Sequence, residues 1–166
     1  FFDLALENLL WEKKPTKALS GSIDQVKWFE DGLINLSRNC LDKHLSDRGD
    51  HPALIWEGEP GDKRTLSYKD LYELTCQIAT VLKRFEVKKG DRVLICMPMV
   101  PELVATVLAC ARIGAVHSVV FAGFSAKSIA DRSIDCEPKL LVTEDIGKRK
   151  AKNLGIKAIV DEARTL

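Results

Sequence analysis

The feature that most constrains the fold is a strand–helix–strand pattern in the middle of the chain. Residues 92–97, RVLICM, form an apolar run that is too short for a helix and is typical of a strand buried on both faces. Pro101 and Glu102 predict a helix start, because proline suits the first turn and an acid suits the positive end of the helix dipole. Gly114 is typical of a helix end, and residues 116–121 form a second apolar run. The sequence therefore predicts an α/β fold.

The same pattern continues toward the C-terminus. Ser125 can cap a further helix, and residues 140–143 form a third short apolar run. Residues 156–160 suggest a fourth strand. Successive strands thus begin about two dozen residues apart, which is the spacing of strand–helix units in a doubly wound sheet. We therefore expect a parallel sheet flanked by helices.

Ligands of such sheets bind outside the carboxyl ends of the strands, so the loops there are candidate binding elements. They are residues 97–101, 121–125 and 144–150, and we expect them to share one edge of the sheet. In the second loop, Gly123 allows a ligand to approach the backbone closely, although a tight turn would explain this glycine equally well. The basic run at residues 147–152, GKRKAK, can hold phosphates, although a solvated charged loop is the commoner explanation.

Upstream of the strand–helix–strand unit, the chain predicts a β-hairpin and a strongly amphipathic helix. The expected elements are a helix at 1–10, irregular chain at 11–22, a helix capped by Asn35 or Ser37, hairpin strands at 53–57 and 64–66, and a helix from residue 67 onward. Ser67 and Asp70 form an acidic variant of the capping box. We divide the chain into a helical and irregular N-terminal extension, residues 1–50, and the first part of an α/β domain, residues 51–166.

Composition argues against several classes of protein. The chain has 25 basic and 24 acidic residues, and a formal charge of +1 gives no electrostatic footprint for nucleic acid or an anionic membrane. Its five cysteines are odd in number and scattered through apolar segments, which suits reduced thiols in a cytoplasm. No metal-ligand spacing appears, and no apolar run approaches the ~18 residues of a membrane-spanning helix. We expect a cytoplasmic protein with no metal, nucleic-acid or membrane partner.

Local motifs for nucleotide binding and hydrolysis are incomplete. The sequence contains neither G-x-x-x-x-G-K-[ST] nor G-x-G-x-x-G, so no complete ATP site is predicted. Gly123 and Ser125 partly match the nucleophile elbow of hydrolases, but Lys127 replaces the second glycine. That elbow also requires a histidine downstream of the serine, and all three histidines precede it. We therefore interpret Ser125 as a helix cap and predict no catalytic residue in this chain.

Four stretches covering nearly the whole chain carry a family resemblance. They are KWFEDGLINLSRNCLDKHL (27–45), ALIWEGEPGDKRTLSYKDL (53–71), GDRVLICMPMVPELVATVLACARIGAVHSVVFAGFSA (90–126) and IVDEA (159–163). These stretches closely resemble the acetyl-coenzyme A synthetases of the adenylate-forming ligase superfamily. The WFEDGLIN segment and the WEGEPGD hairpin are similar to those that separate the acetyl and propionyl branch from other adenylate-forming ligases.

The resemblance implies a two-step ligase. Acetate and Mg-ATP would give acetyl-adenylate and pyrophosphate, and the thiol of CoA would then take the acyl group and release AMP. The chain matches about the first quarter to third of such an enzyme. The start at Phe1 instead of a methionine also suggests a piece of something longer. The phosphate loop, acetate pocket and C-terminal lysine would lie in the remainder of the same chain, so we expect residues 1–166 alone to be inactive and to bind no cofactor tightly.

Two alternatives stay open at this point. The first is a propionyl-CoA or other short-chain acyl-CoA synthetase, and the second is a non-catalytic α/β binding module.

For the residues of this chain, the resemblance implies a CoA site. In the family, a loop F-G-G-F-S lines the CoA path, and an R-x-x-R pair holds the CoA nucleotide. The matching residues are Ala122 and Gly123 in the loop, and Arg149 and Lys152 in the basic run. Guanidinium and ammonium groups both hold phosphate, but Lys152 offers a point charge where the family has the planar guanidinium group of an arginine. Ala122 replaces the first family glycine, so we expect a looser contact with CoA.

Overall fold

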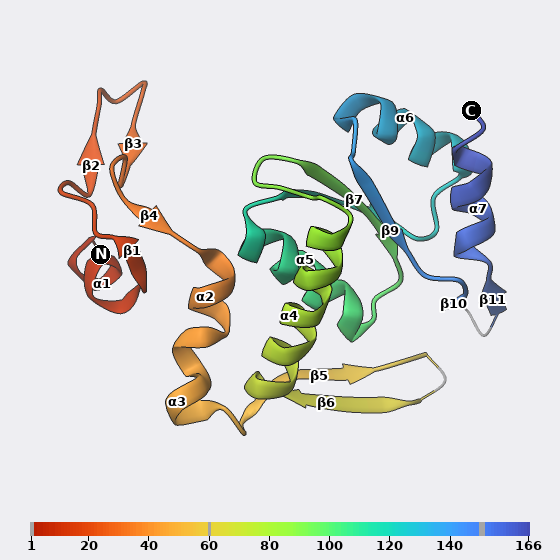
Figure 1. Ribbon diagram of the computed structural model, residues 1–166, viewed down its shortest axis with the longest axis horizontal. Coiled ribbons are helices and arrows are strands. Elements are labelled where there is room, and N and C mark those ends of the chain that lie inside the picture. The colour runs from red at the N-terminus through yellow and green to blue at the C-terminus, as the bar shows by residue number, and fades with distance from the viewer. Residues whose placement is uncertain (1, 60, 150–151) are drawn as a thin grey trace.

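The fold is built around a three-stranded parallel sheet (Figure 1). The computed structural model describes residues 2–59, 61–149 and 152–166. The sheet consists of β7 (Arg92–Met97), β8 (Val116–Phe121) and β9 (Leu140–Thr143), in the order β8-β7-β9. The register is unbroken, and Ile95 of the central strand lies opposite Val119 on one side and Val142 on the other. The predicted α/β fold with a parallel sheet is therefore confirmed.

Helices cover both faces of the sheet. They are α4 (Tyr68–Arg84), α5 (Pro101–Ile113), α6 (Ala126–Cys136) and α7 (Ile156–Ala163). On β7, Val93 and Ile95 pack with α4 and α5, whereas Leu94 and Cys96 pack with α6 and α7. All four side chains are fully buried. The crossover helices α5 and α6 therefore lie on opposite faces, and the loops after β7 and β8 leave the sheet in opposite directions, which opens a crevice at its carboxyl edge.

The ends of the helices form where the sequence predicts them. The Ser67 hydroxyl accepts the N–H of Asp70 at 3.1 Å, and the Ser67 N–H donates to the Asp70 carboxylate at 2.9 Å, so the capping box of α4 is complete. Gly114 ends α5 with a φ of 76°, a left-handed conformation that favours glycine. The Ser125 hydroxyl accepts the N–H of Ser128 at 3.3 Å, so Ser125 is the N-cap of α6, as expected.

Replacing Ser67 with alanine is expected to lower the free energy of unfolding by about 1 kcal/mol, because it removes the side-chain acceptor of the capping box. The midpoint of urea unfolding, followed by circular dichroism, measures the effect. Ser133→Ala, in the interior of α6, serves as the control, because alanine is a better helix former than serine. Equal losses in the two variants would contradict the role of the cap.

The N-terminal segment contains more strand than the sequence predicts. Its elements are α1 (Phe2–Asn8), β1 (Trp11–Lys13), β2 (Leu19–Ser20), β3 (Lys27–Trp28), β4 (Leu33–Ile34), α2 (Leu36–Cys40), η1 (Asp42–His44) and α3 (Leu45–Arg48). The segment expected to be irregular, residues 11–22, in fact holds β1 and β2, which pair antiparallel with β4 and β3. These strands have two or three residues each, too few for a period-2 pattern to be visible in the sequence. In Figure 1 the β2–β3 pair lies away from the parallel sheet.

Specific side chains attach this segment to the α/β body. The Asn35 side chain caps α2 by accepting the N–H of Arg38 at 3.2 Å, and its amide donates to the carbonyl of Arg112 at 3.0 Å, at the end of α5. Asp42 receives two hydrogen bonds from the guanidinium of Arg112, at 2.7 and 2.8 Å. Leu41 is buried in a cluster shared with α4 and α5. A division of the chain near residue 50 stays a prediction.

The structure corrects two expectations in the C-terminal part. Residues 156–160 were expected to form a strand but belong to helix α7, whose Ile156, Val160 and Ala163 are buried at helical spacing. The basic run was expected to be a loop, but β10 (Gly147–Arg149) and β11 (Lys152–Leu154) form an antiparallel hairpin there. The remaining two residues of the basic run, Lys150 and Ala151, lie outside the described residues.

The predicted hairpin upstream of α4 is confirmed. It consists of β5 (Pro52–Glu57) and β6 (Lys63–Ser67), paired antiparallel.

All five cysteines are free thiols, and burial raises the pKa of Cys110 to about 11. Among the described residues, no helix has the length and apolar character needed to cross a membrane.

Candidate functional site

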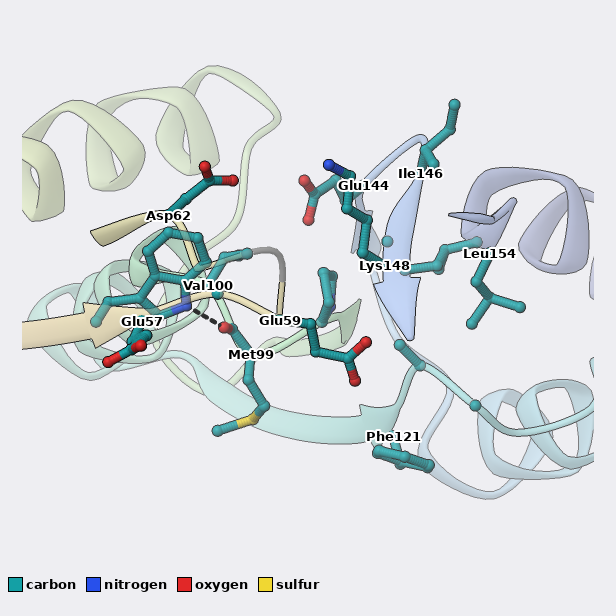
Figure 2. Close-up of a pocket in the computed structure, with 17 residues that line it drawn as sticks. Glu57, Glu59, Asp62, Met99, Val100, Phe121, Glu144, Ile146, Lys148 and Leu154 are labelled. Carbon is teal, nitrogen blue, oxygen red and sulfur yellow. Dashed lines mark hydrogen bonds between the residues drawn. The ribbon is translucent and has the colours of Figure 1, made fainter. Parts of the chain in front are cut away.

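A cleft of about 390 Å³ lies at the carboxyl edge of the parallel sheet (Figure 2). Four segments line it: the tip of the β5–β6 hairpin, the loop after β7, the end of β8 with the loop that follows, and the chain from the end of β9 through the β10–β11 hairpin to the start of α7. Met99, Phe121 and Glu144 represent the last three of these segments. The expectation that the loops after the three parallel strands share one edge is therefore confirmed.

Two polar contacts fix the hairpin against the loop after β7 and the start of α5. The indole N–H of Trp56 donates to the carbonyl of Met99 at 2.6 Å, drawn as the dashed line in Figure 2. In the first turn of α5, Glu102 pairs with Arg64 of β6 at 2.7 Å. Gly58 lies against the Trp56 ring so closely that a β-carbon there would come within 2.6 Å of it. The hairpin therefore forms a positioned wall of the cleft.

The cleft is apolar in part and carries more acids than bases. Figure 2 shows Glu57 and Asp62 on the hairpin side, and Glu144, Ile146 and Leu154 on the opposite side. Its carboxylates belong to Glu57, Glu59, Asp62 and Glu144, whereas Lys148 is the one cation among the described residues that line it. Such a lining suits a neutral or apolar portion of a ligand better than it suits several phosphates.

Glu144 is the most unusual polar group of the cleft. Its Oε2 atom is buried and accepts no hydrogen bond from any described residue. Burial first, and then the charges of Glu102 and Asp145, raise the pKa of the Glu144 carboxyl above its ordinary value. The carboxyl group thus holds its proton to a higher pH than a solvated glutamate does.

The structure brings the predicted loop and the predicted basic segment to the same cleft. Ala122 and Gly123 lie at its edge, after β8, and Gly147 and Lys148 line it from β10. Within the hairpin, Arg149 and Lys152 are directly opposite one another in the register. The loop after β8 and the first residues of the basic hairpin therefore line one cleft, whereas Arg149 and Lys152 belong to the same hairpin but are not among the described residues that line the cleft.

Ala122, which stands where the resemblance expects glycine, is almost completely buried, with 7% of its surface exposed. It belongs to the apolar cluster that includes Val120 and Ile129, beneath the cleft. Its methyl group therefore packs mainly into the core and takes little space from a ligand.

Sequence reasoning missed the hairpin wall and Glu144. The hairpin itself was predicted, but nothing in its sequence indicates that its tip docks beside the loop after β7. Glu144 falls within a loop that was expected to lie at the site, yet only the fold reveals that its carboxyl group is buried there. In the described part of the chain, no group of three or more His, Cys, Asp or Glu side chains could hold a metal ion.

Comparison with known proteins assigns the chain to a family. A family model described as AMP-binding enzyme matches residues 41–165, and a model described as acetyl-coenzyme A synthetase N-terminus matches residues 1–40. A curated acetyl-coenzyme A synthetase of Mesorhizobium japonicum is 49% identical over 157 residues, which cover 92% of this chain and 24% of that protein. One of Yersinia pestis (strain Pestoides F) is 55% identical over 139 residues, covering 83% of this chain and 21% of that protein.

The chain thus spans about a quarter of the length of the curated relatives that it matches. The AMP-binding model alone covers most of the chain, including the parallel sheet and all four segments of the cleft. Its match and the α/β fold agree, and the chain belongs to the family of AMP-binding enzymes.

Proposed function

We propose that the whole protein is an AMP-forming acetate–CoA ligase. The observation that carries this proposal is the identity of 49 to 55% to curated acetyl-coenzyme A synthetases across most of this chain. In the first half-reaction, an oxygen of acetate attacks the α-phosphate of Mg-ATP, which gives acetyl-adenylate and releases pyrophosphate. In the second, the thiol sulfur of CoA attacks the acetyl carbonyl, loses its proton, and displaces AMP.

The part that we assign to residues 1–166 is one side of the CoA site. The proposal is supported by the loop with Ala122 and Gly123, which lines the cleft together with Gly147 and Lys148 of the hairpin that also carries Arg149 and Lys152. Because the cleft itself is apolar and acidic, we place the neutral pantetheine arm there and the phosphates of CoA at the basic hairpin. Lys148 lies between the two regions, since it belongs to the hairpin and also lines the cleft.

Other parts of the reaction need residues beyond this chain. Neither phosphate-cradling glycine motif occurs in the sequence, so we assign ATP, its Mg²⁺ and acetate to the remainder of the whole protein. The five free cysteines support a reducing compartment, and we propose a cytoplasmic location.

The experiment uses the purified whole protein and varies only the hairpin. Arg149→Ala is expected to raise the KM for CoA about 10-fold, because a charge-assisted hydrogen bond to phosphate is lost. Lys152→Arg is expected to lower this KM several-fold, because the planar guanidinium group of arginine can donate two hydrogen bonds to one phosphate. Both variants should leave acetate-dependent exchange of pyrophosphate into ATP unchanged, since that half-reaction needs no CoA.

Three controls test the assignment of the CoA site separately from the assignment of the ligase activity. If Arg149 holds the 3′-phosphate, Arg149→Ala should raise the KM for dephospho-CoA less than it raises the KM for CoA. Residues 1–166 alone should show no pyrophosphate exchange. Propionate replaces acetate in a parallel assay, and a higher kcat/KM for propionate would instead identify a propionate–CoA ligase. No acyl-dependent exchange by the whole protein would overturn the proposed function.

A further inference from the structure

Glu144 is held at the cleft by the backbone on both of its sides. It follows β9 directly, and Thr143, the last residue of that strand, pairs with Cys96 of the central strand. On the other side, the carbonyl of Asp145 accepts the N–H of Lys157 in α7, at 3.3 Å. The side chain of Glu144 therefore extends into the cleft from a segment that is fixed both at the sheet and at a helix.

One oxygen of this carboxyl group lacks a hydrogen-bond donor. Glu144 as a whole is partly exposed, but its Oε2 atom is buried and accepts no hydrogen bond from any described residue. Buried polar atoms are almost always paired in proteins, because an unpaired one is destabilising. Since this acceptor lies in the lining of a cleft, a ligand that carries a donor can pair with it.

The charges nearest to Glu144 are acidic. Glu102, in the first turn of α5, raises the pKa of Glu144 although it is itself paired with Arg64 of β6 at 2.7 Å. Asp145, the next residue in the chain, is exposed and acts in the same direction. Burial is the larger cause, so the carboxyl group of Glu144 ionises above its ordinary pKa of 4.5.

The other walls of the cleft add further acids and one described cation. The loop after β8 contributes no charged residue to the lining, and α7 places its Lys157 in a pair with Asp161. The β5–β6 hairpin contributes three carboxylates, one of which pairs with Lys63 at 3.4 Å, and β10 contributes the cation. These residues are Glu57 (the partner of Lys63), Glu59, Asp62 and Lys148. The surroundings of Glu144 therefore disfavour a phosphate and favour an uncharged N–H donor.

We propose that, in the whole protein, the ionised carboxylate of Glu144 accepts a hydrogen bond from an N–H group of CoA. This inference rests on the proposed function, which places part of CoA in the cleft. CoA carries uncharged N–H donors in two places, the amides of its pantetheine arm and the amino group of its adenine. Its phosphates offer acceptors, so they cannot satisfy the unpaired Oε2 atom. Glu144 thus selects for the uncharged portion of CoA.

Binding of CoA is then coupled to the ionisation of Glu144. A hydrogen bond donated to the carboxylate stabilises its charged form, so the pKa of Glu144 is lower in the complex than in the free protein. When CoA binds below the pKa of the free protein, the carboxyl group releases its proton to the solvent. The affinity for CoA therefore rises with pH through that acidic range and stays constant above it.

Calorimetric titration of the purified whole protein with CoA, between about pH 5 and 8, tests the proposal. Glu144→Gln keeps the shape and an acceptor oxygen but cannot ionise. It is expected to raise the Kd for CoA about 5-fold at the alkaline end, because a charge-assisted hydrogen bond becomes a neutral one. The ratio of the two Kd values should shrink as the pH falls through the pKa of Glu144. Protonation of the phosphates of CoA cancels in this ratio, because both proteins bind the same ligand.

A second variant tests the ionisation itself. Asp145→Asn removes one of the charges that raise the pKa of Glu144, and Asp145 is not among the described residues that line the cleft. This variant should shift the pH dependence of the Kd to lower pH and leave the Kd at the alkaline end unchanged. A purely structural role of Glu144 would not produce this shift.

A CoA analogue identifies the donor. In this analogue a hydrogen atom replaces the amino group of adenine. If Glu144→Gln no longer changes its Kd, the adenine amino group is the donor, and if the effect persists, the donor is an amide of the pantetheine arm.

The outcomes separate this inference from the proposed function. A ratio of Kd values that does not change with pH would overturn the role of Glu144 and leave the proposed ligase intact. No binding of CoA at any pH would overturn the CoA site and this inference with it. Acetate-dependent exchange of pyrophosphate into ATP needs no CoA, so its loss with Glu144-dependent CoA binding retained would count against the ligase function alone.

Discussion

Ile95→Ala is expected to lower the free energy of unfolding by about 3 to 4 kcal/mol, because it leaves a cavity at the centre of the core. Ile95 has no exposed surface and lies in the middle of the central strand, where it packs against α4 and α5. Because strands lie on both sides and helices cover both faces, the surrounding residues can collapse only partly into the space left by the removed atoms. Urea unfolding followed by circular dichroism gives the change.

Matched variants separate the cavity from other effects. Ile95→Val removes a single methylene and should cost about 1 kcal/mol. Ile55→Ala removes the same atoms as Ile95→Ala, but Ile55 is 77% exposed on β5, so this variant should cost less than about 0.5 kcal/mol. If the two alanine variants lost similar stability, the packing described for β7 would be wrong.

Asp42→Asn is expected to cost about 2 to 3 kcal/mol, because it leaves the guanidinium of Arg112 without its charged partner. About a fifth of each side chain is exposed, 22% for Asp42 and 20% for Arg112, so we place the cost below that of a fully buried pair. The pair joins η1 to the end of α5, and Arg112 also lies over the ring of Tyr72 at 5.0 Å. The measured quantity is again the free energy of unfolding.

This ion pair also predicts a dependence on pH. Burial acts to raise the pKa of Asp42, but the hydrogen bonds and charge of Arg112 outweigh it, and the pKa is held below its ordinary value of 3.8. The stabilisation is therefore complete above the pKa of the unfolded chain and is lost as the pH falls through the lower pKa of the folded state. The difference in stability between Asp42→Asn and the original chain should shrink over that acidic range.

The exposed pair of Lys157 and Asp161, one turn apart on α7, provides a comparison. Asp161→Asn should cost about 0.3 to 0.5 kcal/mol, as exposed helical pairs do. A loss at Asp42 no larger than at Asp161 would show that the contact between the N-terminal segment and α5 contributes little to stability.

The parts of the fold that sequence predicts correctly are those governed by local chemistry. The start of α4 follows from Ser67 and Asp70, and the end of α5 follows from Gly114, because each depends on residues within one helical turn. The three parallel strands are also correct, because each is a short apolar run between helix signals. The five residues 156–160 are too few to distinguish a strand from a helix by periodicity, and the buried Ala163 beyond them decides for α7.

The candidate site is less predictable, because its walls are far apart in the sequence. The three loops at the strand ends follow from the topology of a doubly wound sheet. The hairpin wall depends on the hydrogen bond from Trp56 to Met99, a contact across 43 positions that no local pattern contains. The roles of Arg149 and Lys152 rest on family resemblance, and their part in CoA binding stays a prediction.

The placement of α5 and α6 on opposite faces of the sheet has a consequence for how this site can evolve. The crevice arises because the chain changes faces between its two crossovers, so its location is set by the backbone path and not by any one side chain. Residues around it can therefore change without moving the crevice, particularly where a side chain packs into the core, as the methyl group of Ala122 does. Ligand specificity can therefore change while the location of the site in the fold stays the same.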